Sequence, residues 1–510
     1  MRTLLLTIAV LVMPVSLAAG CGNIDKAASG PSELVPAGAV IYGEANLRPE
    51  GDQKQAIDSI LSKFPGGGQA GDKLKDLIEK GLRESDAPIS FKEDIEPWLG
   101  DEAALFATGL GPNGQLEGSA GLIATTDEGK ARDALEKSAE GKTQKHSYND
   151  VDYLTDDSGQ AGAVFDGFLV LGTEAGVKAA IDASKDGPTL SDDDAYNKAT
   201  ENAASDRLAL FYVNSPEFLT AARQSGAPLP DSFKKFFQQP VVATVDADDD
   251  GVLVEANVPP ELARSFAFFG EGSDLLVDLP ADSWVALGQK DLGKLIEFYV
   301  DAYAGVAGGR DAIEGQFRAA TGLDLQQDVL SWMGDFGIFV SGTSPASLDG
   351  ALVVQTSDEA ASVRFLAALA RIAKTQADNP GDRVVPLTAP GGGKGFTLVS
   401  PDIPKPIHSF VQDGKLVFAY GDAAAKDAVN PAHKLGDSPD FNSVKDSLGD
   451  YDVSMYVLVK PILDLVESTS AGSDANWQKA KPYLEPLNAL VAGTSGSGDD
   501  VKSAFKLVVK

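Results

Sequence analysis

A set of alternating aspartates has the residue types and spacing of a metal site. Asp246, Asp248 and Asp250 precede Gly251, as in the first half of an EF-hand calcium loop. Carboxylate oxygens suit calcium, which takes about six to eight oxygen ligands. However, the twelfth position of the loop is Asn257 instead of a glutamate, and apolar residues typical of strands flank the run. The pattern therefore favours a solvated hairpin turn, and a calcium site with these aspartates as ligands is the alternative.

Two other runs resemble parts of known motifs, but both are incomplete. Residues 390–395 are rich in glycine and include Lys394, yet a phosphate-binding loop needs Ser or Thr after the lysine and a helix after the loop. Residues 232–235 fit Ser-x-x-Lys, but the companion Ser-Asp-Asn and Lys-Thr-Gly motifs are absent. We therefore assign no catalytic, cofactor-binding or metal residue beyond the calcium alternative, and we expect no cofactor. The pattern favours a protein that is not an enzyme.

The histidines and carboxylates leave one enzymatic alternative. His146, His408 and His433 show no metal-binding spacing, and we expect His146 and His408 to be exposed or in hairpins. Acidic pairs such as Asp156-Asp157 are typical of turns and helix starts. One sequence does not show whether carboxylates that are distant in the chain converge into a general acid/base pair. A hydrolase with a dispersed carboxylate site is therefore the alternative function.

Composition excludes several classes of partner and site. The chain of 510 residues has 43 Lys+Arg against 75 Asp+Glu, a formal net charge of −32, and a single cysteine. So negative a chain repels phosphate backbones, which argues against nucleic-acid binding. One cysteine makes neither an internal disulfide nor a thiolate zinc site. The 43% hydrophobic and 23% charged residues are typical of a globular protein.

The single cysteine lies where a lipid anchor needs it. Residues 1–20 combine Arg2, an apolar stretch too short to span a bilayer, and small residues before Cys21, as in a secretory signal. Leu17-Ala18-Ala19-Gly20-Cys21 is similar to the bacterial lipobox, although the leucine stands one position early. We therefore predict lipidation of Cys21 and anchoring at the extracytoplasmic face of the cell membrane. Residues 21–33 are predicted to form a flexible tether.

Four patterns occur twice in the same order, which predicts an internal repeat. The equivalent positions are separated by 244, 234, 247 and 244 residues, and they are Pro36 and Pro280, Trp98 and Trp332, Gly167 and Gly414, and Tyr212 and Tyr456. We predict two tandem homologous copies at residues 34–259 and 275–510, joined by a connector at residues 260–274. Phe266, Phe268 and Phe269 make this connector apolar.

Each copy reads as an α+β unit. Apolar residues at helical spacing, such as Ile57, Ile60 and Leu61, predict amphipathic helices. Short strands joined by tight turns must be antiparallel, and Asn113-Gly114 predicts a type I′ hairpin turn. Because helices and strands occur in groups, the pattern favours an antiparallel sheet with packed helices over a doubly wound parallel sheet. We expect Trp98 and Trp332 to be buried anchors.

The start of the first copy resembles a known family. Residues 34–49, residues 51–54 and 61–66, the Trp98-Leu99-Gly100-Asp101 turn and the Asp166-Gly167 hairpin are similar to an uncharacterised bacterial envelope family, typical of actinobacteria and catalogued as domain of unknown function 3352. The resemblance implies a location at the cell surface. It implies no activity, cofactor or catalytic residue.

These observations predict a lipid-anchored envelope protein with a binding or structural role. Its contact with the membrane is expected through the lipid on Cys21. A lipid, a glycan or a protein stays open as the ligand, and carriage of a lipid or another apolar ligand is a further alternative. A long apolar cavity between the sheet and its helices would point to such carriage.

Overall fold

The computed structural model divides the chain into two compact units, Met1–Pro259 (unit 1) and Pro260–Lys510 (unit 2). The described residues are 30–84, 88–139, 143–226, 238–259, 270–304, 307–375, 381–387, 393–496 and 501–510. Cys21, residues 232–235 and residues 266–269 therefore lie outside the described part of the chain. No described helix is long and apolar enough to cross a membrane.

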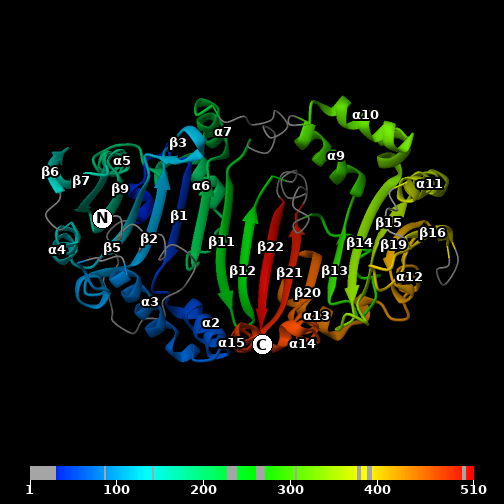
Figure 1. The fold of residues 1–510 in the computed structure, drawn as a ribbon. Coiled ribbons are helices and arrows are strands. Elements are labelled where there is room, and N and C mark those ends of the chain that lie inside the picture. Colours follow the sequence, from blue (N-terminus) through cyan, green and yellow to red (C-terminus); the bar gives the residue numbers. More distant parts are fainter. Residues whose placement is uncertain are drawn as a thin grey trace. The chain divides into compact units, whose positions relative to one another are not determined.

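Unit 1 contains a sheet in which ten described strands pair antiparallel throughout, in the order β12-β11-β10-β1-β2-β5-β9-β8-β7-β6 (Figure 1). The strands are β1 (Ile41–Asn46), β2 (Leu99–Ala107), β5 (Ala120–Thr125), β6 (Thr143–Tyr148), β7 (Val151–Asp156), β8 (Gln160–Phe165), β9 (Phe168–Thr173), β10 (Ala209–Val213), β11 (Val241–Asp248) and β12 (Gly251–Asn257). A small ribbon, β3 (Gly109–Leu110) with β4 (Leu116–Glu117), extends from the connection between β2 and β5.

The helices of unit 1 cover both faces of this sheet. They are α2 (Gly51–Ser62), α3 (Ala70–Glu84), α4 (Glu128–Ser138), α5 (Glu174–Ser184), α6 (Asp194–Thr200) and α7 (Ser215–Gln224), with the short helices η1 (Pro31–Leu34), η2 (Gly67–Gln69), η3 (Phe91–Ile95), η4 (Pro112–Gly114) and η5 (Leu190–Asp192). One face, with Tyr42 and Tyr212, packs against η1, α5, η5 and α6. The other face, with Ile123 and Leu169, packs against α3, η3 and α4.

Unit 2 repeats the strand order of unit 1. Its described strands pair antiparallel in the order β22-β21-β20-β13-β14-β15-β19-β18-β17-β16. They are β13 (Val285–Gln289), β14 (Met333–Ser341), β15 (Asp349–Thr356), β16 (Arg383–Pro386), β17 (Lys394–Val399), β18 (Ile407–Gln412), β19 (Lys415–Tyr420), β20 (Asp452–Leu458), β21 (Leu487–Ser495) and β22 (Lys502–Val509). The order matches strand for strand, and the pairing of Leu287 with Met455 corresponds to that of Gly43 with Phe211.

The helices of unit 2 follow the same plan. They are α9 (Leu292–Ala304), α10 (Arg310–Thr321), α11 (Glu359–Thr375), α12 (Asp422–Asp427), α13 (Pro439–Ser447), α14 (Val459–Glu467) and α15 (Ala475–Leu484), with η7 (Leu325–Val329), η8 (Leu330–Trp332), η9 (Leu435–Asp437) and η10 (Ser470–Ser473). Helices α9 and α11 with η7 and η8 pack on one face of the sheet around Phe336 and Leu416. Helix α12 contacts β15 and β19.

Two tight hairpins show how the sequence makes this topology. Asp166-Gly167 joins β8 to β9 and Asp413-Gly414 joins β18 to β19, and all four residues have positive φ, between 47° and 78°. A type I′ turn needs this conformation at both central residues, and its twist matches that of the flanking strands. The mixed helical and antiparallel architecture confirms the α+β class that the sequence predicts.

Two local predictions differ from the structure. Asn113-Gly114 does not form a type I′ turn, because the tip of the β3–β4 ribbon is the helix η4 and only Gly114 of the two has positive φ. Pro31 and Leu34 are buried in η1, so the residues just before Leu34 form part of the packed body instead of the flexible tether. Contacts of η1 with α5 and η5 fix this segment.

Candidate functional site

The three aspartates of the calcium alternative lie around a hairpin turn between β11 and β12. The Asp248 carboxylate accepts hydrogen bonds from the backbone N–H groups of Asp250 (2.9 Å) and Gly251 (3.0 Å). Asp246 is half-buried on β11, and burial raises the pKa of its carboxyl, as does the negative charge of Glu255. Among the described residues, no group of three or more metal-ligating side chains is placed to hold an ion. The geometry gives the calcium alternative no support.

His408 lies on a strand of the β18–β19 hairpin, one of the two positions expected for it, but it is not exposed. This side chain is fully buried on β18. Its Nδ1 lies 3.1 Å from the Thr397 hydroxyl and its Nε2 lies 2.8 Å from the Asp422 carboxylate. Because Asp422 belongs to α12, the local polar context did not reveal that a helix covers this strand. The three groups have catalytic residue types, but the buried ring has no access to a substrate.

The two tryptophans are buried anchors, as the sequence predicts. Trp98 is 1% and Trp332 is 3% exposed. Each indole N–H donates to the backbone carbonyl four residues earlier, Asp94 and Asp328 respectively. In both units a one-turn π-helix, η3 or η7, comes shortly before the tryptophan. The tryptophan side chain that follows it is buried in the core. A stacking role for either ring in ligand binding finds no support.

One face of the unit 2 sheet is apolar but not fully covered. Two adjacent rows of side chains cross seven paired strands on this face, and we call them the open face of unit 2. The rows are Phe505, Ala492, Met455, Leu287, Ile338, Leu352 and Phe418, and Leu507, Leu490, Val457, Val285, Val340, Gly350 and Tyr420. Only Ala492, Met455 and Leu287 of these are buried, and Ile338 is 37% exposed.

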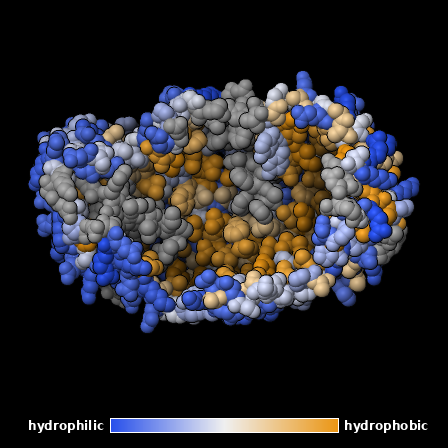
Figure 2. All heavy atoms as spheres, in the orientation of Figure 1, coloured by the Kyte–Doolittle hydropathy of each residue, from blue (hydrophilic) through white to orange (hydrophobic). Residues whose placement is uncertain are grey.

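The opposite face of the same strands shows the contrast. Ala286, Phe339, Val417 and Tyr456 point to that side and are at most 1% exposed. An antiparallel sheet with one solvated face normally carries polar residues there. The two rows of the open face carry no polar group except the hydroxyl of Tyr420, and Figure 2 shows hydrophobic residues gathered over this face. A contiguous apolar surface of this kind marks a site of interaction.

Unit 1 has the corresponding row of residues, but three of the seven, Gly43, Gly121 and Leu171, are buried. The row that matches Ile338 consists of Ala256, Ala243, Phe211, Gly43, Leu105, Gly121 and Leu171. Phe211 lies on a strand with partners on both sides and is still 37% exposed. A Cβ atom at Gly43 would lie 3.2 Å from the Phe211 ring, so glycine lets this ring approach the neighbouring strand.

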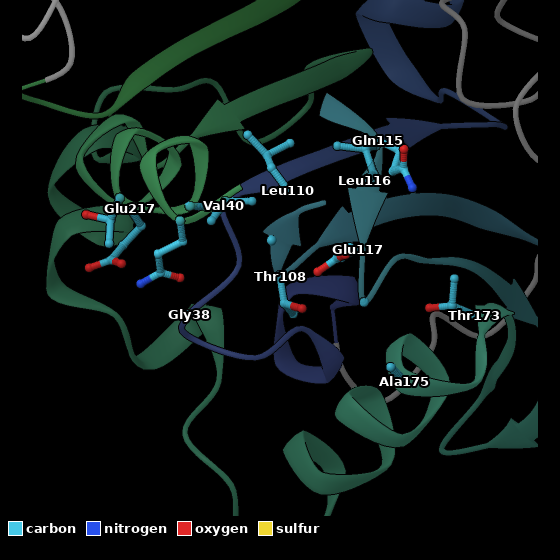
Figure 3. A pocket seen from close by; sticks show the side chains of 15 residues that line it. Gly38, Val40, Thr108, Leu110, Gln115, Leu116, Glu117, Thr173, Ala175 and Glu217 are labelled. Carbon is cyan, nitrogen blue, oxygen red and sulfur yellow. The ribbon is translucent and has the colours of Figure 1, made fainter. Parts of the chain in front are cut away.

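A second candidate in unit 1 is a polar cavity of about 620 Å³. It lies between the β3–β4 ribbon, helix α7, the start of α5 and the segment before β1 (Figure 3). In Figure 3, Glu117 on the ribbon and Glu217 on α7 stand on different sides of it. Its lining contains threonine, glutamine and glutamate side chains, and no Lys, Arg or His. We call it the polar cavity.

Neither surface was identified from the sequence. Runs such as Ile338-Phe339-Val340 are apolar at every position, which is typical of a strand buried on both faces. The sequence carries no signal that one of these faces lacks a cover. The polar cavity joins residues from positions 38 to 224, which only the fold brings together. Residues 232–235 and Cys21 lie outside the described residues.

The chain belongs to a family described as "Protein of unknown function (DUF3352)". The match to this family covers residues 44–506, which is nearly the whole chain. It confirms the family that the sequence resembles. The family's description supplies no activity, ligand or functional residue.

The solved structures that match this chain resemble it only weakly. Two crystal forms of a protein called TP0453 align with about half of this chain, 47% and 46%, and with 81% and 80% of their own chain. Their identities are 10% and 11%, and their TM-scores are 0.24 and 0.23. These scores are too low to carry an argument about this protein. No curated protein matches the chain.

Proposed function

We propose that this protein is a lipid-anchored binding protein of the extracytoplasmic membrane surface, and that its open face takes the acyl chain of a lipid. The observation that carries the proposal is the open face of unit 2, where Ile338 and its neighbours form two apolar rows that remain accessible. The lipobox around Cys21 supports the location, because it would place this surface next to a bilayer.

The chemistry of the surface favours an acyl chain over a polar ligand. Every residue in the two rows is aliphatic, aromatic, glycine or methionine. The only polar side-chain group among them is the hydroxyl of Tyr420. Burial of one exposed Ile or Leu side chain is worth about 1.5–3 kcal/mol. A flexible hydrocarbon chain follows such a surface without leaving polar groups unpaired, whereas a sugar or peptide backbone would lose hydrogen bonds with water.

We further propose that the two units are tandem homologous copies. Their identical strand order supports this, as do two details that ordinary convergence would not require. The Ser90 N–H donates to the Asp94 carboxylate (2.8 Å), and the Asp324 N–H donates to the Asp328 carboxylate (2.9 Å), each just before its tryptophan. The Tyr212–Tyr196 ring pair of unit 1 corresponds to the Tyr456–Phe441 pair of unit 2, both edge to face.

The binding proposal is tested by displacement of a fluorescent fatty acid, cis-parinaric acid, from the purified full chain. Ile338→Asp places a charge in the middle of the open face, and we expect it to weaken binding by at least about tenfold. The matched control is Leu77→Asp, because Leu77 is 65% exposed on α3 and lies outside these rows. Equal binding by the wild type and Ile338→Asp, or no binding by the wild type, would contradict the proposal.

The anchoring proposal has its own experiment. Because Cys21 is the only cysteine, metabolic labelling with an alkyne fatty acid tests one attachment point. We expect Cys21→Ala to abolish thioether-linked label and to release the protein from the membrane fraction, whereas Cys21→Ala should leave fatty-acid displacement unchanged. Label that persists in Cys21→Ala would rule out the anchor without affecting the binding proposal.

A further inference from the structure

The polar cavity of unit 1 is a built recess and not a gap between loops. Helix α7 turns one side toward it, with Glu217, Thr220, Ala221 and Gln224 at the i, i+3, i+4, i+7 spacing of a single helical face. The other side of α7 buries Leu219 and Ala222. The helix is therefore fixed by its apolar side, and its polar side is free to face a ligand.

The opposite wall is a feature that unit 2 does not share. The β3–β4 ribbon supplies Leu116 and Glu117, and it belongs to a connection that spans residues 108–119 in unit 1. The corresponding connection in unit 2 spans only residues 342–348, and these contain no strand. The ribbon is paired through Gly109 with Glu117 and Leu110 with Leu116, so the wall holds its shape. An element added to one unit alone points to a role that the shared fold does not require.

The side chains in the cavity define the ligand's chemistry. The side chains of Glu217 and Gln224 have no hydrogen-bond partner within the described residues, and the Thr220 hydroxyl donates to the Pro216 carbonyl, which leaves its lone pairs to accept. Carboxylates without a nearby cation repel an anion. Glu117 and Glu217 stand on different walls of the cavity, and the groups between them are neutral (Figure 3). A ligand in the cavity would therefore meet hydrogen-bonding groups on several sides instead of one concentrated charge.

We propose that the polar cavity binds a short uncharged saccharide. Its volume of about 620 Å³ lies within the range of small-molecule sites. Hydroxyl groups that point in several directions find acceptors on α7 and on the ribbon, while the exposed Leu116 offers an apolar surface to the C–H groups of a sugar ring. This inference is independent of the acyl-chain proposal, because the two sites share no residue.

The test is isothermal titration of the full chain with maltose, trehalose and N,N′-diacetylchitobiose. We expect at least one of the three to bind, and the double variant Thr220→Val, Gln224→Leu to weaken that binding by about tenfold or more, since each lost hydrogen bond is worth about 1 kcal/mol. Ala221→Trp, which places an indole ring inside the cavity between the polar groups of α7, should weaken it at least as much. Arg223→Ala is the control, because Arg223 is exposed on α7 and does not line the cavity.

Each outcome decides the proposal. A variant that unfolds at the same temperature as the wild type is taken to be folded. The two cavity variants act by different means, so if one of them misfolds, the other still tests the proposal. Failure of all three saccharides to bind, or binding that survives both variants, overturns the proposal, and so does binding of spermidine in their place. Ile338→Asp should leave saccharide binding unchanged, which separates this result from that of the open face.

Discussion

At the residue scale, the carboxylates of this acidic chain differ in what folding does to their charge. Asp246 is half-buried beside Glu255, and both effects raise the pKa of its carboxyl. Asp127 caps α4, where its carboxylate accepts a hydrogen bond from the Lys130 N–H at 3.1 Å. That bond, and the Lys130 charge, lower the pKa of Asp127. The two residues should therefore respond to pH in opposite directions.

The prediction compares Asp246→Asn with Asp127→Asn in urea unfolding at several pH values. A raised pKa in the folded state contributes stability below the ordinary aspartate pKa of about 3.9 and loses it as the pH rises. Asp246→Asn should therefore be more stable than the wild type at pH 7, with the difference vanishing below about pH 4. A lowered pKa works the other way, so Asp127→Asn should be less stable at pH 7 and equal to the wild type in acid. The same sign for both variants would refute the explanation.

At the element scale, tight hairpins bring neighbouring strands of the sheet into register with few residues. The Asp413-Gly414 turn sets β18 against β19 from Gln412 and Lys415 outward. Gly414 has φ of 72°, and a Cβ atom there would meet nothing within 4 Å. The turn therefore needs glycine at position 414 for its backbone conformation and not for lack of space. The Gly414 carbonyl also accepts from the Thr356 N–H at 2.9 Å, which ties the hairpin to β15.

Substitution at Gly414 tests this reading by denaturant unfolding. Gly414→Ala should destabilise the protein by about 1–2 kcal/mol, the cost of a left-handed conformation for an L-residue. Gly414→Asn should cost less, because asparagine adopts this conformation more readily. Gly315→Ala on α10 is the control, and it should stabilise by about 0.5–1 kcal/mol since its site is helical and open. Equal effects of Ala and Asn at position 414 would show that the turn does not set the cost.

At the scale of the whole molecule, the net charge and the proposed lipid anchor have opposite effects on contact with a membrane. A net charge of −32 disfavours contact with an anionic membrane surface. The lipobox offers another means of attachment, because two acyl chains on one cysteine hold a protein at a membrane without any basic surface. Attachment and surface charge are then separate properties, and the body of the protein stays off the headgroups to which it is tied.

Vesicle sedimentation checks this separation. Cys21→Ala protein should not sediment with phosphatidylglycerol vesicles at low salt, because the chain and the vesicle repel each other. The lipidated protein should sediment with phosphatidylcholine vesicles and with anionic ones alike. Salt-sensitive binding of Cys21→Ala to anionic vesicles alone would instead indicate a basic surface on the body.

The sequence by itself determined the family, the α+β class and the buried positions of Trp98 and Trp332. These follow from local patterns: strand and helix periodicity, Gly-containing turns, and short motifs that recur. It predicted the duplication and the anchor at Cys21 from the same kind of pattern, and both remain proposals. The run at Asp246 had the residue types of a metal site but lacked the arrangement.

Only the tertiary structure decided which faces are covered. His408 is buried because Asp422, on a helix that follows later in the chain, packs over it. Ile338 is 37% exposed although its strand reads as fully buried, whereas Phe336, two residues earlier on the same face, lies in the core beneath the helices. Exposure depends on what packs from elsewhere in the chain, and the polar cavity exists for the same reason, since α7 and the β3–β4 ribbon meet only in the folded unit.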